Sequence, residues 1–415
     1  MRILLGLFLP LYVFAQSYGL STLLENANKE NALIKAKEIS IKSKQEEVEA
    51  VKSAYWPTLD VGASYSYVSP NSLVSPGQTT TGYAALKLNI YDGGRKNALL
   101  SAKRYEEEAA LFEKIAFEKS ITLDIVRQYY SIRKYRATLQ ALEERSTELR
   151  AQIQRVKKFK LSGLATQEEV DKLQAEYDGN NYTMANTKLE LQRSEKNLQL
   201  LSGLPAKNLK NDRFREPKNI QFEIFENIKM LQANANAIGE NSNAIDAGYG
   251  PHVNVSDTYY KSHYGDTVTM AGFDGDGLLI DHQNTLMISV DMRLFDNGRM
   301  TKESEAVKYQ KLALLSEIEY AENEQEMNFH LSQKSLETIR TRLKSAKSAL
   351  RAAKSTYDAL KQKFEVGLVD NIAFLDALSQ KTLAQARYKE TLYDYEIGKS
   401  IYYYYAGKDP KEYIR

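Results

Sequence analysis

The 415-residue chain contains no cysteine, so its stability comes from packing and assembly rather than disulfides, and no thiol is available for acylation. Neither sign of charge dominates, because the chain has 56 Lys and Arg residues and 54 Asp and Glu residues. This balance argues against a nucleic-acid partner, since such proteins usually carry a basic surplus. Past the N-terminus no stretch reaches the ~18 apolar residues of a membrane helix, so any membrane-spanning part must consist of β-strands.

Sequence motifs of enzymes are missing as well. The chain has no phosphate-binding P-loop, no dinucleotide-binding glycine pattern and no Gly-x-Ser-x-Gly nucleophile elbow. Asp274–Gly277 lacks the spacing and the terminal Glu of a calcium loop, and we interpret the scattered His252, His263 and His282 as surface residues. We therefore predict that the protein is not an enzyme and binds no cofactor or metal.

The first residues have the pattern of a cleavable signal peptide. Arg2 is followed by an apolar run over Ile3–Phe14 and then by Ala15. An N-terminal membrane anchor is the alternative, but the run is too short to cross a bilayer as a helix. We predict a signal peptide over residues 1–15 and a mature chain that begins near Gln16.

What the chain does contain is an internal repeat with a spacing of 204 residues. Tyr91–Arg95 (YDGGR) recurs as Phe295–Arg299 (FDNGR), and Gly163-Leu164 recurs as Gly367-Leu368. A repeat of this kind determines the architecture before any single residue is interpreted. We predict a first structural repeat over residues 16–204, a linking segment over 205–225 and a second repeat over 226–415.

Each repeat contains two stretches in which apolar and polar residues alternate. In the first repeat these are Thr58–Val68 and residues 83–91, with a polar loop over Ser69–Thr81 between them. Such a hairpin has strands of about ten residues, which is enough to cross a bilayer when tilted, although soluble amphipathic hairpins share the pattern. The chain passes into the following helix at the end of each hairpin, and we expect these junctions to be formed by Asp92, Gly94, Arg95, Asp296, Gly298 and Arg299.

The hairpin of the second repeat is less regular. Its first strand begins near Val253 and carries Asp257 on its apolar face. A longer loop over Lys261–Thr285 precedes the second strand, which alternates over residues 286–294. The four strands together give the chain a small β part.

Long helices take up the rest of each repeat. A helix is expected over residues 21–55, and proline-free stretches after each hairpin carry apolar residues every seventh position, which specifies coiled-coil packing. A helix of ~65 residues is about 100 Å long, more than any bilayer, so these helices extend into water. Gly163 and Gly367 end them in left-handed turns, and helices over about 166–201 and 370–405 return.

Four strands cannot close a membrane barrel, because the smallest barrels have about eight. An open sheet edge cannot face lipid, so the strands must close by association of two or three chains. Conduction favours three, since an eight-stranded barrel is filled by its own side chains. The helices carry apolar residues on more than one face, which suits a wall of helices around a lumen. An ordinary antiparallel coiled-coil bundle remains the alternative.

Taken together, the paired motifs Tyr91–Arg95 and Phe295–Arg299 and the helix turns Phe159–Leu164 and Phe364–Leu368 resemble the TolC family of outer-membrane channel-tunnels. The resemblance covers nearly the whole mature chain. It implies a mainly α protein with a β-barrel part: a homotrimer whose twelve-stranded barrel sits in the lipid of a Gram-negative outer membrane and continues as a long α-helical barrel in the periplasm. It also implies a passive duct that works with a periplasmic adaptor and an inner-membrane pump.

The resemblance further implies roles for residues at the helix turns. The adaptor-docking tips are Gly163, Leu164, Gly367 and Leu368 by position. The family often carries rings of aspartates at its periplasmic gate, and the matching residue here is Asp376, with Asp370 or Glu169 as substitute charges. Ala373 stands at the second common aspartate position, and Val369 replaces the basic residue that latches the closed state in some relatives.

We predict an efflux duct for drugs, bile salts or other small toxic molecules. Secretion of a polypeptide through the same fold is the rival within the family, and genes beside this one would separate the two. A structural or adhesive trimeric coiled-coil surface protein is the alternative of another class, and it predicts a trimer without conductance.

Overall fold

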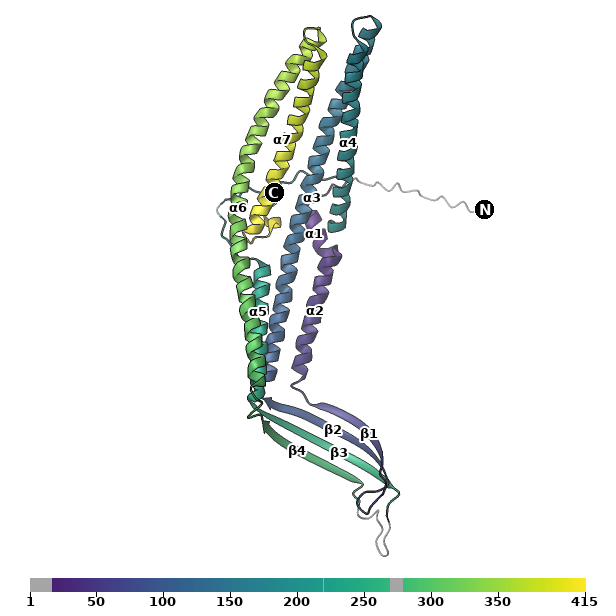
Figure 1. Ribbon diagram of the computed structural model, residues 1–415, viewed down its shortest axis with the longest axis vertical. Coiled ribbons are helices and arrows are strands. Elements are labelled where there is room, and N and C mark those ends of the chain that lie inside the picture. The colour runs from purple at the N-terminus through teal and green to yellow at the C-terminus, as the bar shows by residue number, and fades with distance from the viewer. Residues whose placement is uncertain (1–16, 219, 269–278) are drawn as a thin grey trace, which may run out of the picture. The chain divides into compact units, whose positions relative to one another are not determined.

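The computed structural model describes residues 17–218, 220–268 and 279–415 (Figure 1). The expected signal peptide over residues 1–15 and the Asp274–Gly277 segment lie outside these ranges. The chain divides into two compact units. The described parts of Met1–Lys37, Lys114–Glu226 and Ala321–Arg415 form the helical unit. Glu38–Glu113 and Asn227–Tyr320 form the sheet-bearing unit.

The sheet-bearing unit contains one four-stranded antiparallel sheet in the order β1-β2-β3-β4. Its strands are β1 (Thr58–Tyr67), β2 (Gln78–Asp92), β3 (Pro251–Gly265) and β4 (His282–Met292). The register pairs Leu59 with Leu86 and Val255 with Ile288, so the apolar residues of all four strands share one face. Asp257 pairs with both Leu86 and Leu286 and therefore lies on that apolar face, as the sequence indicated.

The inner strands are longer than the alternation predicted. Gln78–Thr81 and Lys261–Gly265 were expected in loops, but they pair with each other and extend β2 and β3 to 15 residues each. The reason is that β2 and β3 join the two repeats: Gln78–Thr81 pairs with both β1 and β3, and Ser262–Gly265 pairs with β2. Their added backbone hydrogen bonds outweigh the polar composition of these segments.

Helices follow the repeat closely. The long helices α3 (Arg95–Leu161) and α6 (Arg299–Glu365) have 67 residues each. Their return helices α4 (Gln167–Ser202) and α7 (Asn371–Tyr405) have 36 and 35 residues. The remaining elements are α1 (Leu20–Glu30), α2 (Ala32–Ser53), α5 (Glu226–Asp246) and the short 3₁₀ turns η1 (Ala247–Tyr249) and η3 (Pro410–Tyr413). No helix in the described ranges is both long enough and apolar enough to span a membrane.

The expected helix over residues 21–55 is broken at Asn31, and this expectation was wrong. Asn31 has extended backbone angles, and its side-chain oxygen accepts from the backbone N–H of Leu33 at 2.9 Å. This is the geometry of an N-cap, so α2 starts anew. The Asn31 amide also donates to the carbonyl of Leu201 at 3.0 Å, which ties the break to the end of α4.

The linking segment is packed into the helical unit rather than lying on its surface. Phe214 is buried, its N–H donates to Glu396 Oε2 at 2.7 Å, and its carbonyl accepts from Lys399 Nζ at 2.7 Å. Lys399 is 2% exposed and lies 2.9 Å from Glu396, so this buried charge is paired. The segment thus contributes core residues that connect α7 to the first repeat.

The tyrosine run at the end of α7 lies partly in the same core. In the run Tyr402–Tyr405, Tyr402 and Tyr403 are buried within their own protomer. Tyr403 stacks on Tyr413 with ring centroids 3.8 Å apart, and its hydroxyl donates to the carbonyl of Arg215. Tyr404 and Tyr405 pack around Phe225. The returning C-terminal segment provides the cover that the sequence pattern did not show.

Candidate docking tips and gate

The two helical hairpins end in turns of the same geometry. Gly163 and Gly367 have φ of +73° and +75°, in the left-handed region that glycine adopts without strain. In the first turn the N–H of Leu164 donates to the carbonyl of Phe159 at 2.8 Å, and in the second the N–H of Leu368 donates to that of Lys363 at 2.8 Å. These are Schellman turns, and the predicted left-handed glycines are confirmed.

Each return helix then begins at a capped residue in the equivalent position. Thr166 accepts from the N–H of Glu169, and the Glu169 carboxylate accepts from the N–H of Thr166 at 2.9 Å, which completes a capping box. Asp370, 204 residues further on, accepts from the N–H of Ala373 at 2.9 Å. The second tip therefore has the cap but lacks the acidic partner, because Ala373 stands where Glu169 stood.

A small apolar core holds the two hairpin ends together. It buries nine side chains: Leu149, Ile153, Val156, Val170, Leu173, Tyr357, Phe374, Ala377 and Leu378. Phe374 is fully buried and stacks on Phe364 with ring centroids 4.7 Å apart. Because these residues come from α3, α4, α6 and α7, the tips are built as one cluster within the helical unit.

Polar contacts reinforce this cluster on its flanks. Lys361 on α6 lies 2.8 Å from Glu148 on α3. Burial favours the neutral form of Glu148, but its hydrogen bond and attraction to Lys361 prevail and hold its pKa below the usual value. Burial also raises the pKa of Tyr357 to about 12, and the nearby Glu148 charge adds to this. Arg155 donates to the carbonyl of Glu365 and lies over the Phe159 and Phe364 rings.

The three candidate gate carboxylates differ in what they contact. Glu169 and Asp370 are engaged in helix caps, so their side chains already serve a local structural role. Asp376 lies exposed on α7, and among the described residues it has no hydrogen-bond or ion-pair partner. At the equivalent place on α4 stands Lys172, which pairs with Glu168 at 2.7 Å. Of the three, Asp376 is therefore the carboxylate available to a passing solute, and a gate role for any of them remains a prediction.

The predicted tip leucines are exposed. Leu164 is 77% and Leu368 is 74% exposed, and Leu161 beside the first turn is 89% exposed. Two apolar side chains held at the ends of rigid Schellman turns do not pack within their own chain. They provide a surface that suits a partner protein.

The strand-to-helix junctions lie in the sheet-bearing unit and are also repeated. Asp92 accepts from the N–H of Lys96 at 2.9 Å, and Asp296 accepts from the N–H of Met300 at 3.0 Å, so each aspartate caps the first turn of a long helix. The N–H of Met300, together with the Tyr249 hydroxyl and the N–H of Gly298, lowers the pKa of Asp296. Gly94 and Gly298 have φ of +96° and +76°, which the change of direction requires.

The junction arginines make weaker contacts than the aspartates. Arg299 lies 3.6 Å from Glu303 one turn along α6, and both side chains are more than half exposed. Arg95 has no acid partner in the described ranges. The prediction that these two arginines anchor the junctions therefore finds little support in their contacts, while the aspartate caps clearly form.

Sequence reasoning missed several residues that hold the site together. Lys361, Glu148 and Arg155 act between α3 and α6, which are far apart in the chain, so no local pattern indicated them. Phe374 stacks on Phe364 across the turn between α6 and α7 and was missed as well. The heptad positions of Tyr357 and Phe364 were a usable signal, because both lie on the apolar stripe of α6. The Thr-x-x-Glu spacing of Thr166 was also readable as a capping box.

Comparison with known proteins agrees with this arrangement. Residues 23–204 match the sequence profile described as "Outer membrane efflux protein". A comparison with curated protein sequences finds no significant match.

Solved structures of the same fold are outer-membrane proteins. VceC from Vibrio cholerae is 15% identical with a TM-score of 0.79 over 94% of this chain and 96% of its own. The CmeC outer membrane channel of Campylobacter jejuni is 15% identical, with a TM-score of 0.81 over 94% of this chain and 85% of its own. The open-state MtrE channel of Neisseria gonorrhoeae is 12% identical, with a TM-score of 0.77 over 94% and 89%. The chain has the fold of these outer-membrane proteins.

Proposed function

Because residues 23–204 match the outer membrane efflux protein profile, we propose that this chain belongs to that family and forms the exit duct of a tripartite efflux system. Three copies close a twelve-stranded barrel in the outer membrane of a Gram-negative bacterium. The helices continue as a barrel in the periplasm. The duct passively conducts drugs or other small toxic molecules that an inner-membrane pump delivers through a periplasmic adaptor.

The main support for this proposal is the exposed apolar face of the four-stranded sheet. Its apolar face is exposed, with Leu59, Val61, Leu286, Ile288 and Val290 between 67% and 76% exposed. In water such a face would be covered or would aggregate. Among the described residues the outer strands β1 and β4 each have one neighbouring strand, so the sheet has two open edges. Lipid is the natural cover for the face, and neighbouring copies are the natural partners for the edges.

The helices support assembly independently. Large apolar residues of α6 are exposed in a single copy: Tyr309, Leu312, Leu315, Tyr320, Met327 and Leu331. The other apolar flank of α6 is buried within its own chain, at Phe329, Leu336 and Tyr357. A helix that is apolar on both flanks packs neighbours on both sides, as a closed wall of helices requires.

The hairpin tips are the proposed docking points for the adaptor. Leu164 and Leu368 are exposed apolar contacts on rigid turns, and Gly163 and Gly367 hold these turns in shape. Asp376 is the proposed constriction charge, because it is exposed and unpartnered in the part of the chain that the structure describes. A ring of three such carboxylates would attract cations.

A matched pair of substitutions on β4 tests the membrane assignment. Ile288→Lys places a charge on the apolar face near mid-strand, which costs about 2 to 4 kcal/mol at the middle of a bilayer. Met287→Lys places the same charge on the opposite face. We expect trimers of the first variant to disappear from isolated outer membranes while those of the second remain. Equal amounts of both would show that the apolar face does not contact lipid.

Function is tested in a Gram-negative strain whose own duct gene is deleted. Expression of the chain with its adaptor and pump should lower the accumulation of a fluorescent efflux substrate, and Met287→Lys should retain this activity. Membrane trimers that leave accumulation unchanged would contradict the efflux role.

A further inference from the structure

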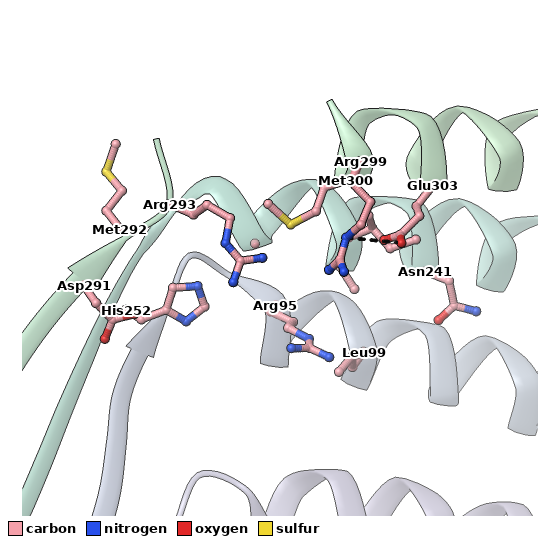
Figure 2. Close-up of a pocket in the computed structure, with 13 residues that line it drawn as sticks. Arg95, Leu99, Asn241, His252, Asp291, Met292, Arg293, Arg299, Met300 and Glu303 are labelled. Carbon is pink, nitrogen blue, oxygen red and sulfur yellow. Dashed lines mark ion pairs between the residues drawn. The ribbon is translucent and has the colours of Figure 1, made fainter. Parts of the chain in front are cut away.

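A cavity of about 640 Å³ lies where the strands meet the helices in the sheet-bearing unit. Residues from α3, α5, β3, β4 and α6 line it. Figure 2 shows Arg293, from just beyond the end of β4, and Arg95, from the start of α3, turned toward the same open space. Arg299 reaches the same cavity from the start of α6.

Of the sheet residues that line the cavity, His252 and Asp291 lie on the polar face, and Met292, the last residue of β4, lies on the other face. His252 pairs directly with Asp291 across β3 and β4, so the two share a face, and Arg293 continues that face two residues further along the chain. Ile288 and Val290 lie on the opposite, apolar face. In the proposed trimer the apolar face contacts lipid, and the polar face with its cavity therefore faces the lumen.

The charges around this cavity are not balanced. Arg95 and Arg293 have no acid partner among the described residues, while Arg299 is held loosely by Glu303 at 3.6 Å. The second acid, Asp291, accepts from the amide of Asn254 at 3.4 Å. Three guanidinium groups thus face two carboxylates, of which one is engaged with Arg299. The two free guanidinium groups are forked donors suited to a carboxylate, sulfonate or phosphate.

One wall of the same cavity is apolar. Leu99, Ala244, Ile245 and Met300 line it from the helical side, and Met300 is 6% exposed. An apolar wall beside free guanidinium groups matches a solute that has both an apolar body and an anionic head. A free inorganic anion would leave the apolar wall in water, whereas a neutral apolar solute would leave the arginines without a partner.

We propose that Arg95 and Arg293 form a lumen-facing site that binds small amphipathic anions on their way through the duct. The inference rests on the proposed function for the direction of the polar face, but binding itself requires no conduction. Each assembled duct would carry three such sites at the strand-to-helix junction. They would favour anionic cargo at this level, in contrast to the acidic ring proposed at the tips.

The test compares two dyes that share an anilinonaphthalene body. 8-Anilinonaphthalene-1-sulfonate carries a sulfonate, whereas N-phenyl-1-naphthylamine is neutral. Both are titrated by fluorescence against the full-length protein in nanodiscs of zwitterionic lipid, with empty discs subtracted. Arg95→Gln with Arg293→Gln removes the proposed partners, and Arg351→Gln with Lys354→Gln removes the same charge from exposed positions elsewhere on α6.

We expect the Arg95 and Arg293 double variant to raise the Kd of the sulfonate dye about tenfold or more, as the loss of charge-assisted hydrogen bonds predicts. The neutral dye and the α6 control should be unaffected. An unchanged Kd for the sulfonate dye in the double variant would overturn the proposal. So would displacement of the dye by short-chain phosphatidylglycerol but not by decanoate, since the site would then hold a lipid headgroup. Selective binding by a protein that never conducts would leave the site in place and refute the duct.

Discussion

The turn between α3 and α4 and the turn between α6 and α7 share a backbone but not their charges. Both have a left-handed glycine, a Schellman turn and a capped return helix at equivalent positions. Six residues beyond the cap the first copy carries Lys172 and the second carries Asp376. Residues that the turn geometry requires are repeated, whereas the exposed charges have diverged. The difference is what we expect if the proposed gate belongs to the second hairpin alone and the proposed docking role is shared by both.

The largest expected difference between the two hairpins is in the packing beneath their turns. Phe374→Ala should lower the free energy of unfolding of the helical unit by about 3 to 5 kcal/mol, because the ring is fully buried against Phe364. The equivalent Val170→Ala should cost about 1.5 to 3 kcal/mol. Hydrogen exchange of amides in α4 and α7 measures both. Equal losses of unfolding free energy in the two variants would show that Phe374 does not stabilise this core more than Val170 does.

The next largest effect is expected from changes to the backbone geometry of the turns. Gly367→Pro cannot adopt the φ of +75° and loses the N–H that donates to Phe364, a local cost of about 3 kcal/mol. We expect drug resistance to fall to the level of a duct deletion while trimers stay in the membrane, and a bulky substitution at Leu368 should act in the same direction. Gly163→Pro is the matched change in the first copy. Resistance at the wild-type level in the Gly367 variant would refute the docking role.

The Glu148–Lys361 contact connects the two hairpins and makes their packing sensitive to acid. Because the pKa of Glu148 is lowered by folding, its contribution is complete above the unfolded value of about 4.3 and is lost as the pH falls through the folded value. Glu148→Gln should cost about 1 kcal/mol at pH 7, since water partly screens the pair. Thermal unfolding measured at decreasing pH should show the gap between wild type and variant constant above about 4.3 and narrowing below it. A gap that does not change until the protein unfolds in acid would exclude this ion pair as its cause.

Helix caps give the smallest expected difference. Thr166→Ala and Asp370→Ala should each cost about 0.5 to 2 kcal/mol, whereas Asp370→Asn should keep the cap and remove only the charge. Ala373→Glu should stabilise the second tip by restoring the capping box of the first. Thermal unfolding ranks these variants. A loss in Asp370→Asn as large as in Asp370→Ala would show that the charge, rather than the cap, is what the turn requires.

Much of the fold was predictable from the sequence because it depends on local patterns and on the repeat. The long helices, their glycine turns and the alternating strands follow from periodicities that each segment carries by itself. Asn31 was missed because a single capping side chain interrupts an otherwise continuous helical composition. The lengths of β2 and β3 were missed because the pairing of the two repeats, rather than alternation, sets where these strands end.

The site was less predictable. The tip glycines and leucines were located correctly because their turn motif is repeated, but the residues that join the hairpins come together only in the folded chain. Glu169 and Asp370 were read as gate charges although their spacing from the helix starts also fits caps. The burial of Lys399 was missed because its partner Phe214 comes from the distant linking segment, although its ion pair with Glu396 lies within α7.

Conductance of the purified protein in a planar lipid bilayer distinguishes a gated duct from a structural trimer. A gated duct with a carboxylate ring at its constriction should give small, cation-selective steps. These steps should grow when Asp376 is replaced by Ala and stay unchanged when Lys172, its counterpart in the first repeat, is replaced by Ala. A stable trimer that shows no steps in the wild type or in the Asp376 variant would contradict the account and favour a structural role.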